Sequence, residues 1–275
     1  MPIRITSLQN SRLKDVLKLA KASERATRRA TVVEGSRECR RALAAGIIPL
    51  EAYICPPLLE PDTEALLPRL AALDAARRTW LAEVTPDVFA KIAVRGASGG
   101  LLLVIPYLTH TLTALQPPAP AFLAIIEGVE KPGNLGAILR SADAAGVHAV
   151  LVNAGATDIH NPNVVRASLG TFFTVPVLEA EPAATIAWLD AASVTIVAAT
   201  PEADTLYTAC DYTQPVALVL GSEADGLSTA WRAAAHHLVR IPMFGQADSL
   251  NLATAAALLF YEVVRQRLAA QIKDA

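Results

Sequence analysis

Short apolar runs alternate with helical stretches along the second half of the chain. Glycine, asparagine, threonine or proline bounds the apolar runs, which are Phe122–Ile126, Ala149–Val152, Val194–Ala199 and Val216–Leu220. Runs of this length fit strands that are covered on both faces. Helical patterns follow at Asn134–Ala145, Asn163–Leu169, Ala183–Ala191, Thr229–Ala235 and from the end of the 241–251 loop through about Arg267. This alternation predicts an α/β fold with a mostly parallel, doubly wound sheet.

The first hundred residues predict a smaller α/β unit. A basic helical stretch over about Ser11–Arg29 precedes the apolar run Thr31–Val33, and a second helix over about Ser36–Ala45 ends at Gly46. Strand-like runs follow at Ala52–Ile54, Trp80–Val84 and Leu101–Ile105. The proline-rich segment 115–120 is incompatible with a helix and reads as a stiff connector. We therefore expect an N-terminal domain over 1–114, a linker over 115–120 and a larger domain over 121–275.

Composition excludes several classes of protein. Of the 275 residues, 53% are hydrophobic and only 18% are charged, which excludes a disordered or fibrous chain. The uncharged stretch 96–126 is interrupted by glycines and prolines well short of a membrane span. Cys39, Cys55 and Cys210 match no metal or redox spacing. Because the first residues contain no apolar signal-peptide core, we expect a cytoplasmic protein without a membrane segment or bound metal.

Charge is distributed unevenly along the chain. The net charge is −2, yet the first 41 residues carry eleven Lys or Arg against four Asp or Glu. A basic segment on a mildly acidic body is typical of a nucleic-acid contact surface. An ordinary solvated helix face explains the same charges, so composition alone leaves both interpretations open.

Three loops follow predicted strands, at the sheet edge where α/β proteins bind ligands. The first, 127–140, opens a helix whose backbone N–H groups favour an anion, with Arg140 as a further anion partner or a surface ion-pair residue. It has neither the G-x-G-x-x-G spacing nor a P-loop lysine. The second, 221–228, is a glycine-bracketed turn in which Ser228 can cap the next helix. The third, 241–251, precedes the last helix, and Ser249 is a candidate for its N-cap.

Asn251 is the residue of the third loop that most clearly indicates a functional role. It is expected two positions inside the last helix, where an amide side chain gains little and competes with backbone bonding. That placement favours a ligand or partner role for Asn251 over a structural one.

Taken together, the three loops resemble the motifs of the SpoU family of RNA ribose 2′-O-methyltransferases, within the SPOUT superfamily. The matching pieces, in the family's order, are Gly133–Asp143, Gly221–Ser228, Ile241–Met243 with Ser249–Asn251, and Tyr261–Glu262. Asn161–Gly170 is similar to the segment between the first two motifs. Ser222, Ala224 and Leu252-Ala253 depart from the residues usual in the family.

The resemblance covers about Phe122 to Arg267. The front region, through Val33–Glu38, is similar more weakly to the ribosomal-protein-like RNA-binding domain that many members carry. The resemblance thus implies a substrate-binding domain followed by a catalytic domain with a deep trefoil knot. It also implies a homodimer through the C-terminal helix, which carries apolar residues on all sides between Leu252 and Val264.

The resemblance implies methyl transfer from S-adenosylmethionine to a ribose 2′-hydroxyl, with S-adenosylhomocysteine as product. It assigns catalysis to Arg140, Asn134, Glu223, Ser249 and Asn251. It assigns cofactor binding to Ala199, Thr200, Pro201, Leu220, Gly221, Glu223, Gly226, Ile241, Pro242, Met243, Ser249 and Leu250. We expect RNA contacts from Arg28, Arg29, Arg37, Lys131 and Arg166.

Arg140 can serve as base or as clamp. The resemblance implies that it activates the hydroxyl together with an RNA phosphate. A guanidinium stays protonated in proteins, so a bidentate clamp on phosphate that stabilises the developing alkoxide is the physically safer role.

Three alternatives remain open at this point. The substrate can be transfer RNA, although a front domain of this kind favours ribosomal RNA. The scaffold can be a non-catalytic RNA-binding protein. A dinucleotide-dependent oxidoreductase can use a similar sheet, although the glycine fingerprint for such a cofactor is missing.

Overall fold

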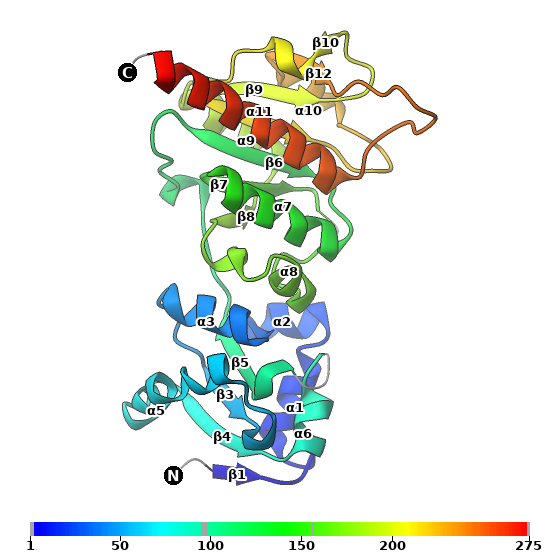
Figure 1. The fold of residues 1–275 in the computed structure, drawn as a ribbon. Coiled ribbons are helices and arrows are strands. Elements are labelled where there is room, and N and C mark those ends of the chain that lie inside the picture. Colours follow the sequence, from blue (N-terminus) through cyan, green and yellow to red (C-terminus); the bar gives the residue numbers. More distant parts are fainter. Residues whose placement is uncertain (1–2, 95–97, 156, 274–275) are drawn as a thin grey trace. The chain divides into compact units, whose positions relative to one another are not determined.

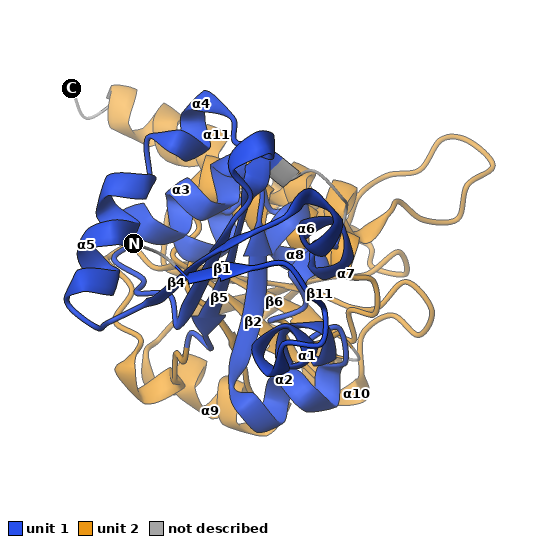
Figure 2. Ribbon diagram, turned by 90° about the horizontal axis from the view of Figure 1, so that it is seen from below, with its two compact units in different colours: residues 1–108, 160–174 blue, residues 109–159, 175–275 orange. Residues whose placement is uncertain are grey.

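The computed structural model describes residues 3–94, 98–155 and 157–273 (Figure 1). The chain forms two compact units, coloured separately in Figure 2. Unit 1 contains residues 1–108 and 160–174, and unit 2 contains residues 109–159 and 175–275.

Unit 1 is built on a five-stranded mixed sheet with the strand order β1-β4-β3-β5-β2. Its strands are β1 (Ile3–Ile5), β2 (Ala30–Glu34), β3 (Glu51–Ile54), β4 (Trp80–Val84) and β5 (Leu101–Pro106). Its helices are α1 (Ser11–Lys18), α2 (Ala22–Arg28), α3 (Ser36–Ala44), α4 (Pro61–Glu64), α5 (Leu67–Ala75), α6 (Pro86–Ile92) and α8 (Pro162–Ala167). β5 runs antiparallel to β2 and β3, while β1, β4 and β3 are parallel.

The basic stretch that predicts one helix over Ser11–Arg29 forms two helices instead. α1 and α2 are separated by residues 19–21. The reason is Arg25, which is buried and donates hydrogen bonds to the carbonyl oxygens of Leu19 (2.8 Å) and Ala20 (3.0 Å). A helix leaves its last carbonyls without partners, and here a side chain from the next helix satisfies two backbone oxygens at the break.

Residues 160–174 belong to unit 1, which differs from the expected division at 115–120. The Thr31 hydroxyl donates a hydrogen bond to the His160 carbonyl oxygen at 2.6 Å. The His160 ring stacks on Tyr107, with 3.6 Å between centroids and 5° between planes. α8 also packs against β2. These contacts join a segment from the middle of the chain to the front unit.

Unit 2 contains a seven-stranded parallel sheet with the order β10-β12-β9-β11-β6-β7-β8. The strands are β6 (Phe122–Glu127), β7 (Ala149–Asn153), β8 (Val177–Glu179), β9 (Thr195–Ala199), β10 (Thr205–Leu206), β11 (Val216–Leu220) and β12 (His237–Arg240). The helices are α7 (Pro132–Ala145), α9 (Pro182–Ala191), α10 (Thr229–Ala234) and α11 (Leu252–Lys273). This confirms the predicted α/β fold with a mostly parallel sheet.

Helices cover both faces of the seven-stranded sheet. Leu189 of α9 and Trp231 of α10 are buried in one cluster with the sheet residues Leu123 and Ile125. α7 and α11 lie side by side on the other face (Figure 1), where the rings of Phe122 and Phe260 meet edge to face at 6.0 Å. Both helices begin at the loop edge of the sheet, which brings the first and third loops together. None of the helices in the described part of the chain combines the length and the hydropathy that a membrane-spanning segment requires.

Candidate active site

The first two loops are joined by a buried carboxylate at the end of β6. Glu127 is 6% exposed, and its Oε2 accepts a hydrogen bond from the Ser228 backbone N–H at 2.8 Å. The Ser228 side chain in turn accepts from the Trp231 N–H, so Ser228 caps α10 as predicted. Glu127 therefore holds the second loop at a fixed position beside the first.

The second loop is a narrow turn that requires glycine at Gly221. Ser222 and Gly226 exchange two backbone hydrogen bonds, each of 3.2 Å. A Cβ atom on Gly221 would lie 2.2 Å from the carbonyl carbon of Gly226, which is closer than any side chain allows. The Ser222 hydroxyl accepts from the Asp225 N–H at 2.9 Å. Serine at this unusual position therefore stabilises the turn itself.

Glu223 brings the three loops together. Its Oε2 accepts a hydrogen bond from Lys131 Nζ at 2.9 Å, and its Oε1 accepts one from Asn134 Nδ2 at 2.9 Å. Asn251 Nδ2 donates to the same Oε1 at 2.8 Å and to Asn134 Oδ1 at 3.2 Å. The structure thus brings together three of the five predicted catalytic residues, and Lys131 joins them from the same loop as Asn134.

Glu223 and Lys131 each shift the pKa of the other. The hydrogen bond from Lys131 is the main cause that lowers the pKa of Glu223, and the Leu252 N–H and Asn134 contribute in the same direction. The same hydrogen bond raises the pKa of Lys131. Because an ion pair favours both charged forms, this cluster keeps a carboxylate and an ammonium at the start of α7.

Asn251 occupies a different position from the one expected. It directly precedes α11, and its Oδ1 accepts from the N–H groups of Ala253 (3.0 Å) and Thr254 (3.4 Å). It is therefore the N-cap of α11, and the prediction that Ser249 caps this helix with Asn251 inside it is wrong. The cap uses only the amide oxygen. The Asn251 NH2 group remains free for Glu223 and Asn134, so one side chain serves both the helix and the site.

Arg140 lies apart from this hydrogen-bonded cluster. It is exposed on α7, six residues after Asn134, and has no hydrogen bond or ion pair to another residue within the described part of the chain. Its guanidinium is thus available to an external anion. This excludes the surface ion-pair interpretation of Arg140 for the described residues.

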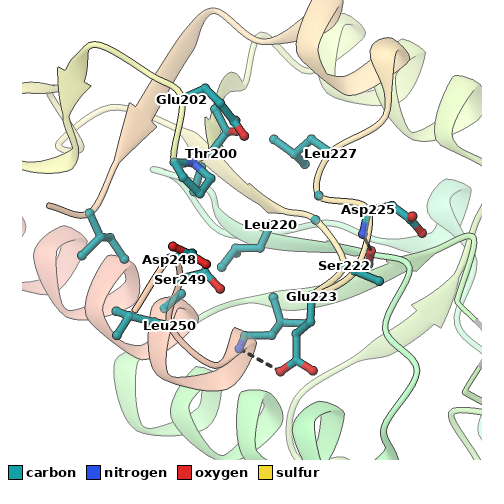
Figure 3. Close-up of a pocket in the computed structure, with 18 of the residues that line it drawn as sticks. Thr200, Glu202, Leu220, Ser222, Glu223, Asp225, Leu227, Asp248, Ser249 and Leu250 are labelled. Atoms are coloured by element: carbon teal, nitrogen blue, oxygen red, sulfur yellow. Dashed lines mark hydrogen bonds between the residues drawn. The ribbon is translucent and has the colours of Figure 1, made fainter. Parts of the chain in front are cut away.

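Beside the cluster lies a cavity of about 400 Å³ (Figure 3). Eleven of the twelve predicted cofactor residues line it, and Pro242 does not. The lining residues outside the predicted cofactor-binding set are Glu202, Ser222, Ala224, Asp225, Leu227, Arg232, Asp248, Leu252 and Ala255. Leu220, Leu227, Ile241 and Leu250 give this cavity, the expected cofactor pocket, apolar walls.

Arg232 is the cation of the cofactor pocket. Its Nη2 donates to Thr200 Oγ1 at 3.1 Å and to Glu202 at 3.0 Å. The hydrogen bond from Thr200, followed by that from Arg232, lowers the pKa of Glu202. No local pattern marks Arg232 in the sequence, because its role depends on α10 packing near the end of β9.

The five predicted RNA-contacting residues have different surroundings. Arg28 forms ion pairs with Asp15 (2.9 Å) and Glu24 (3.3 Å), and its hydrogen bond lowers the pKa of Asp15 to about 2. Arg29 lies over the Tyr107 ring at 5.6 Å. The remaining side chains are Arg37, which is exposed, Arg166, which donates to Asn163 at 2.9 Å, and Lys131.

Comparison with known proteins identifies the family. A sequence model of the SpoU rRNA Methylase family matches residues 121–261, and one of an MRM3-like substrate binding domain matches residues 10–102. The chain belongs to the SpoU rRNA Methylase family, which confirms the resemblance found in the three loops. A relative from Streptomyces viridochromogenes, a 23S rRNA (uridine(2479)-2′-O)-methyltransferase, is 38% identical over 198 residues, 70% of this chain and 69% of the relative.

Two solved structures are similar over nearly the whole chain. One, an RNA 2′-O ribose methyltransferase, is 41% identical with a TM-score of 0.82, over 97% of this chain and 100% of the other. The second is an AdoMet-bound rRNA methyltransferase from Sinorhizobium meliloti. It is 30% identical with a TM-score of 0.87, over 95% of this chain and 97% of the other.

Proposed function

We propose that this protein is an enzyme that methylates the 2′-hydroxyl of a ribose in ribosomal RNA, with S-adenosylmethionine as cofactor. The observation that carries the proposal is the meeting of three loops at Glu223, next to the cofactor pocket. The relatives that are similar over most of this chain are RNA 2′-O-methyltransferases.

The residues of the pocket fit S-adenosylmethionine. A cavity of about 400 Å³ with apolar walls and a few polar groups is of the size that binds a small cofactor. Leu220, Ile241 and Leu250 offer apolar surface to an adenine ring, and the loop backbones offer hydrogen bonds to its edge. When bound, the cofactor supplies an electrophilic methyl group on a sulfonium and becomes S-adenosylhomocysteine.

The protein's own task is on the nucleophile side, because a ribose hydroxyl reacts poorly until its proton is removed or polarised. Arg140, without a protein partner in the described chain, would clamp an RNA phosphate and stabilise the developing alkoxide. Asn134 and Asn251, fixed by Glu223, would position the ribose. Ser249, at the wall of the cofactor pocket, would orient the same sugar.

RNA binding is assigned to unit 1 together with Lys131. The match to a substrate binding domain over residues 10–102 supports this assignment, as does the basic charge of the first 41 residues. If these cations contact phosphates, counterion release makes the affinity for RNA fall steeply with salt. The predicted ribosomal-protein-like domain is part of this proposal.

A homodimer through α11 completes the proposal. Leu258, Tyr261, Leu268 and Ile272 are between 40% and 78% exposed. They lie three, seven and four residues apart, so they form one apolar stripe on the helix. The sequence predicted apolar residues on all sides, but the other side packs on α7 and the sheet. A second copy of the stripe would cover the first.

The trefoil knot and the cytoplasmic location belong to the proposal as well. β11 lies between β6 and β9, the chain then crosses to β12 beyond β9, and α11 returns to α7. Such a path supports a knotted C-terminal segment. The cytoplasmic location stays a prediction.

Transfer of a tritiated methyl group to RNA tests the proposed function. We expect the full chain to methylate ribosomal RNA at a ribose and transfer RNA much less. Arg140→Ala should abolish transfer while calorimetry still detects the cofactor. Equal loss of transfer and of cofactor binding would show that Arg140 is misplaced. Binding of NAD instead of S-adenosylmethionine would support the oxidoreductase, and cofactor binding without transfer to any RNA would contradict the proposed activity.

A further inference from the structure

The charged side chains that line the cofactor pocket are mostly acidic. Four carboxylates and one guanidinium contribute to the lining: Glu202, Glu223, Asp225, Asp248 and Arg232. Arg232 is paired with Glu202 at 3.0 Å, and Glu223 is held by Lys131 at 2.9 Å. Two carboxylates remain without an ion pair or side-chain hydrogen bond among the described residues, those of Asp225 and Asp248.

The two remaining carboxylates lie differently in the pocket. Figure 3 shows Asp248 next to Ser249, on the wall of the pocket formed by the third loop. In the same view the Asp225 carboxylate points away from Leu220. Asp248 is also three residues before Asn251, which is bonded to the Glu223 cluster. Asp248 directly precedes Ser249, which the proposed function places at the reacting ribose. We therefore take Asp248 as the unpaired charge expected nearest the place of methyl transfer.

The donor and the product differ in charge at one atom. S-adenosylmethionine carries a positive sulfonium, whereas S-adenosylhomocysteine has a neutral thioether and is otherwise the same apart from the methyl group. A carboxylate near that sulfur attracts only the sulfonium form. A carboxylate near the adenine, the ribose or the amino acid end would affect both molecules equally.

We propose that Asp248 makes the cofactor pocket selective for the charged methyl donor over its neutral product. The inference rests on the proposed binding of S-adenosylmethionine in this pocket. Selectivity is a difference between two affinities, and Asp248 raises only one of them. The carboxylate loses its charged neighbour when the methyl group has left, so product binding is weaker and product inhibition is reduced.

This role has a kinetic consequence. A carboxylate that stabilises the sulfonium before transfer does not stabilise the transition state as much, because the positive charge is disappearing there. Asp248 therefore lowers the KM for the donor without raising kcat. Removing its charge should raise KM, leave kcat equal or higher, and strengthen inhibition by S-adenosylhomocysteine relative to donor binding.

Calorimetry on the full chain tests the proposal, with Asp248→Asn compared with Asp225→Asn as a matched loss of one charge from the same pocket. The probes are S-adenosylmethionine, S-adenosylhomocysteine and sinefungin, which carries a positive amine where the donor has its methylated sulfur. We expect Asp248→Asn to weaken both cationic probes about fivefold, which is about 1 kcal/mol, and the neutral product less than twofold. Asp225→Asn should change the ratio of donor to product affinity by less than twofold.

The outcomes separate the inference from the proposed function. Equal weakening of all three probes by Asp248→Asn, no weakening, or the same ratio change in Asp225→Asn would overturn the selectivity role. Asp248→Glu should restore most of the ratio, and failure to do so with an unchanged melting temperature would also count against it. Failure of the unchanged protein to bind S-adenosylmethionine would instead overturn the placement of the cofactor.

Discussion

Asn251 Nδ2 lies 2.8 Å from Glu223 Oε1, across 28 positions of sequence. Because the Asn251 Oδ1 caps α11 at the same time, this side chain links the first turn of the C-terminal helix to the loop after β11. The first turn of α11 and the arrangement of the site therefore both depend on the amide side chain of Asn251.

Two substitutions at Asn251 separate these functions. Asn251→Asp keeps an acceptor for the cap but places a second carboxylate beside Glu223, so we expect the unfolding free energy to stay similar and methyl transfer to fall at least tenfold. Asn251→Ala removes the cap as well, and should cost a further ~1 kcal/mol of stability. Denaturant unfolding and a single-turnover methylation assay measure the two effects. Parallel losses in both variants would contradict the division of roles.

The pH dependence of activity should follow the Lys131–Glu223 pair. The pKa of Glu223 is lowered in the folded protein, so its carboxylate is present at neutral pH and is lost only as the pH falls through that lowered value. Lys131→Met removes the main cause of the lowering, which should move the acidic limb of the kcat profile to higher pH. Lys131→Arg keeps a cation and should leave the limb near its original position. Identical profiles for all three proteins would show that Glu223 does not control this limb.

Alanine substitutions at Gly221 and Gly133 test the narrow turn of the second loop, with Gly133 as the control position outside that turn. Gly221→Ala puts a Cβ atom 2.2 Å from the backbone of Gly226, which must displace the second loop and weaken cofactor binding at least tenfold. Gly133 lies in α7 with no neighbouring atom within 4 Å of an added Cβ, so Gly133→Ala should leave the melting temperature equal or higher. Calorimetric cofactor titration and thermal unfolding check both. Normal cofactor binding in Gly221→Ala would mean that the turn adapts.

The dimer is tested by one charge on the exposed stripe of α11. Leu268→Glu places a carboxylate at a side chain that is 55% exposed, and we expect light scattering to change from about twice the 29.0 kDa chain mass to the monomer value. Leu50→Glu alters a leucine of unit 1 that is 47% exposed and should leave the mass unchanged. A monomeric starting protein that still methylates RNA would remove the dimer from the proposal.

The elements that could be predicted from the sequence are those whose burial requires mostly apolar residues. β11 and β4 lie at their expected residues, because strands buried inside a sheet are almost purely apolar. β10 has only two residues, both exposed, and β12 begins with an exposed histidine, so neither carried a readable pattern. The break between α1 and α2 depends on Arg25 reaching back to two carbonyls, a contact that no local propensity contains.

The site was partly predictable for a similar reason. Asn134, Glu223 and Asn251 lie in motifs whose residue types mark them, and the three meet as expected. Arg232 and Asp248 enter the pocket through packing, and nothing in their neighbouring residues distinguishes them. The placement of residues 160–174 in unit 1 likewise depends on long-range contacts, such as the stacking of His160 on Tyr107.

The lining of the cofactor pocket lies entirely between residues 199 and 255. A growing polypeptide therefore completes unit 1 and the strands β6, β7 and β8 before it reaches the first residue of the pocket, Ala199 at the end of β9. A chain that is cut or interrupted ahead of Ala255 lacks one of its walls. Chains that end before Ala255 therefore have an incomplete pocket, and cofactor retention should distinguish them from chains that contain every wall.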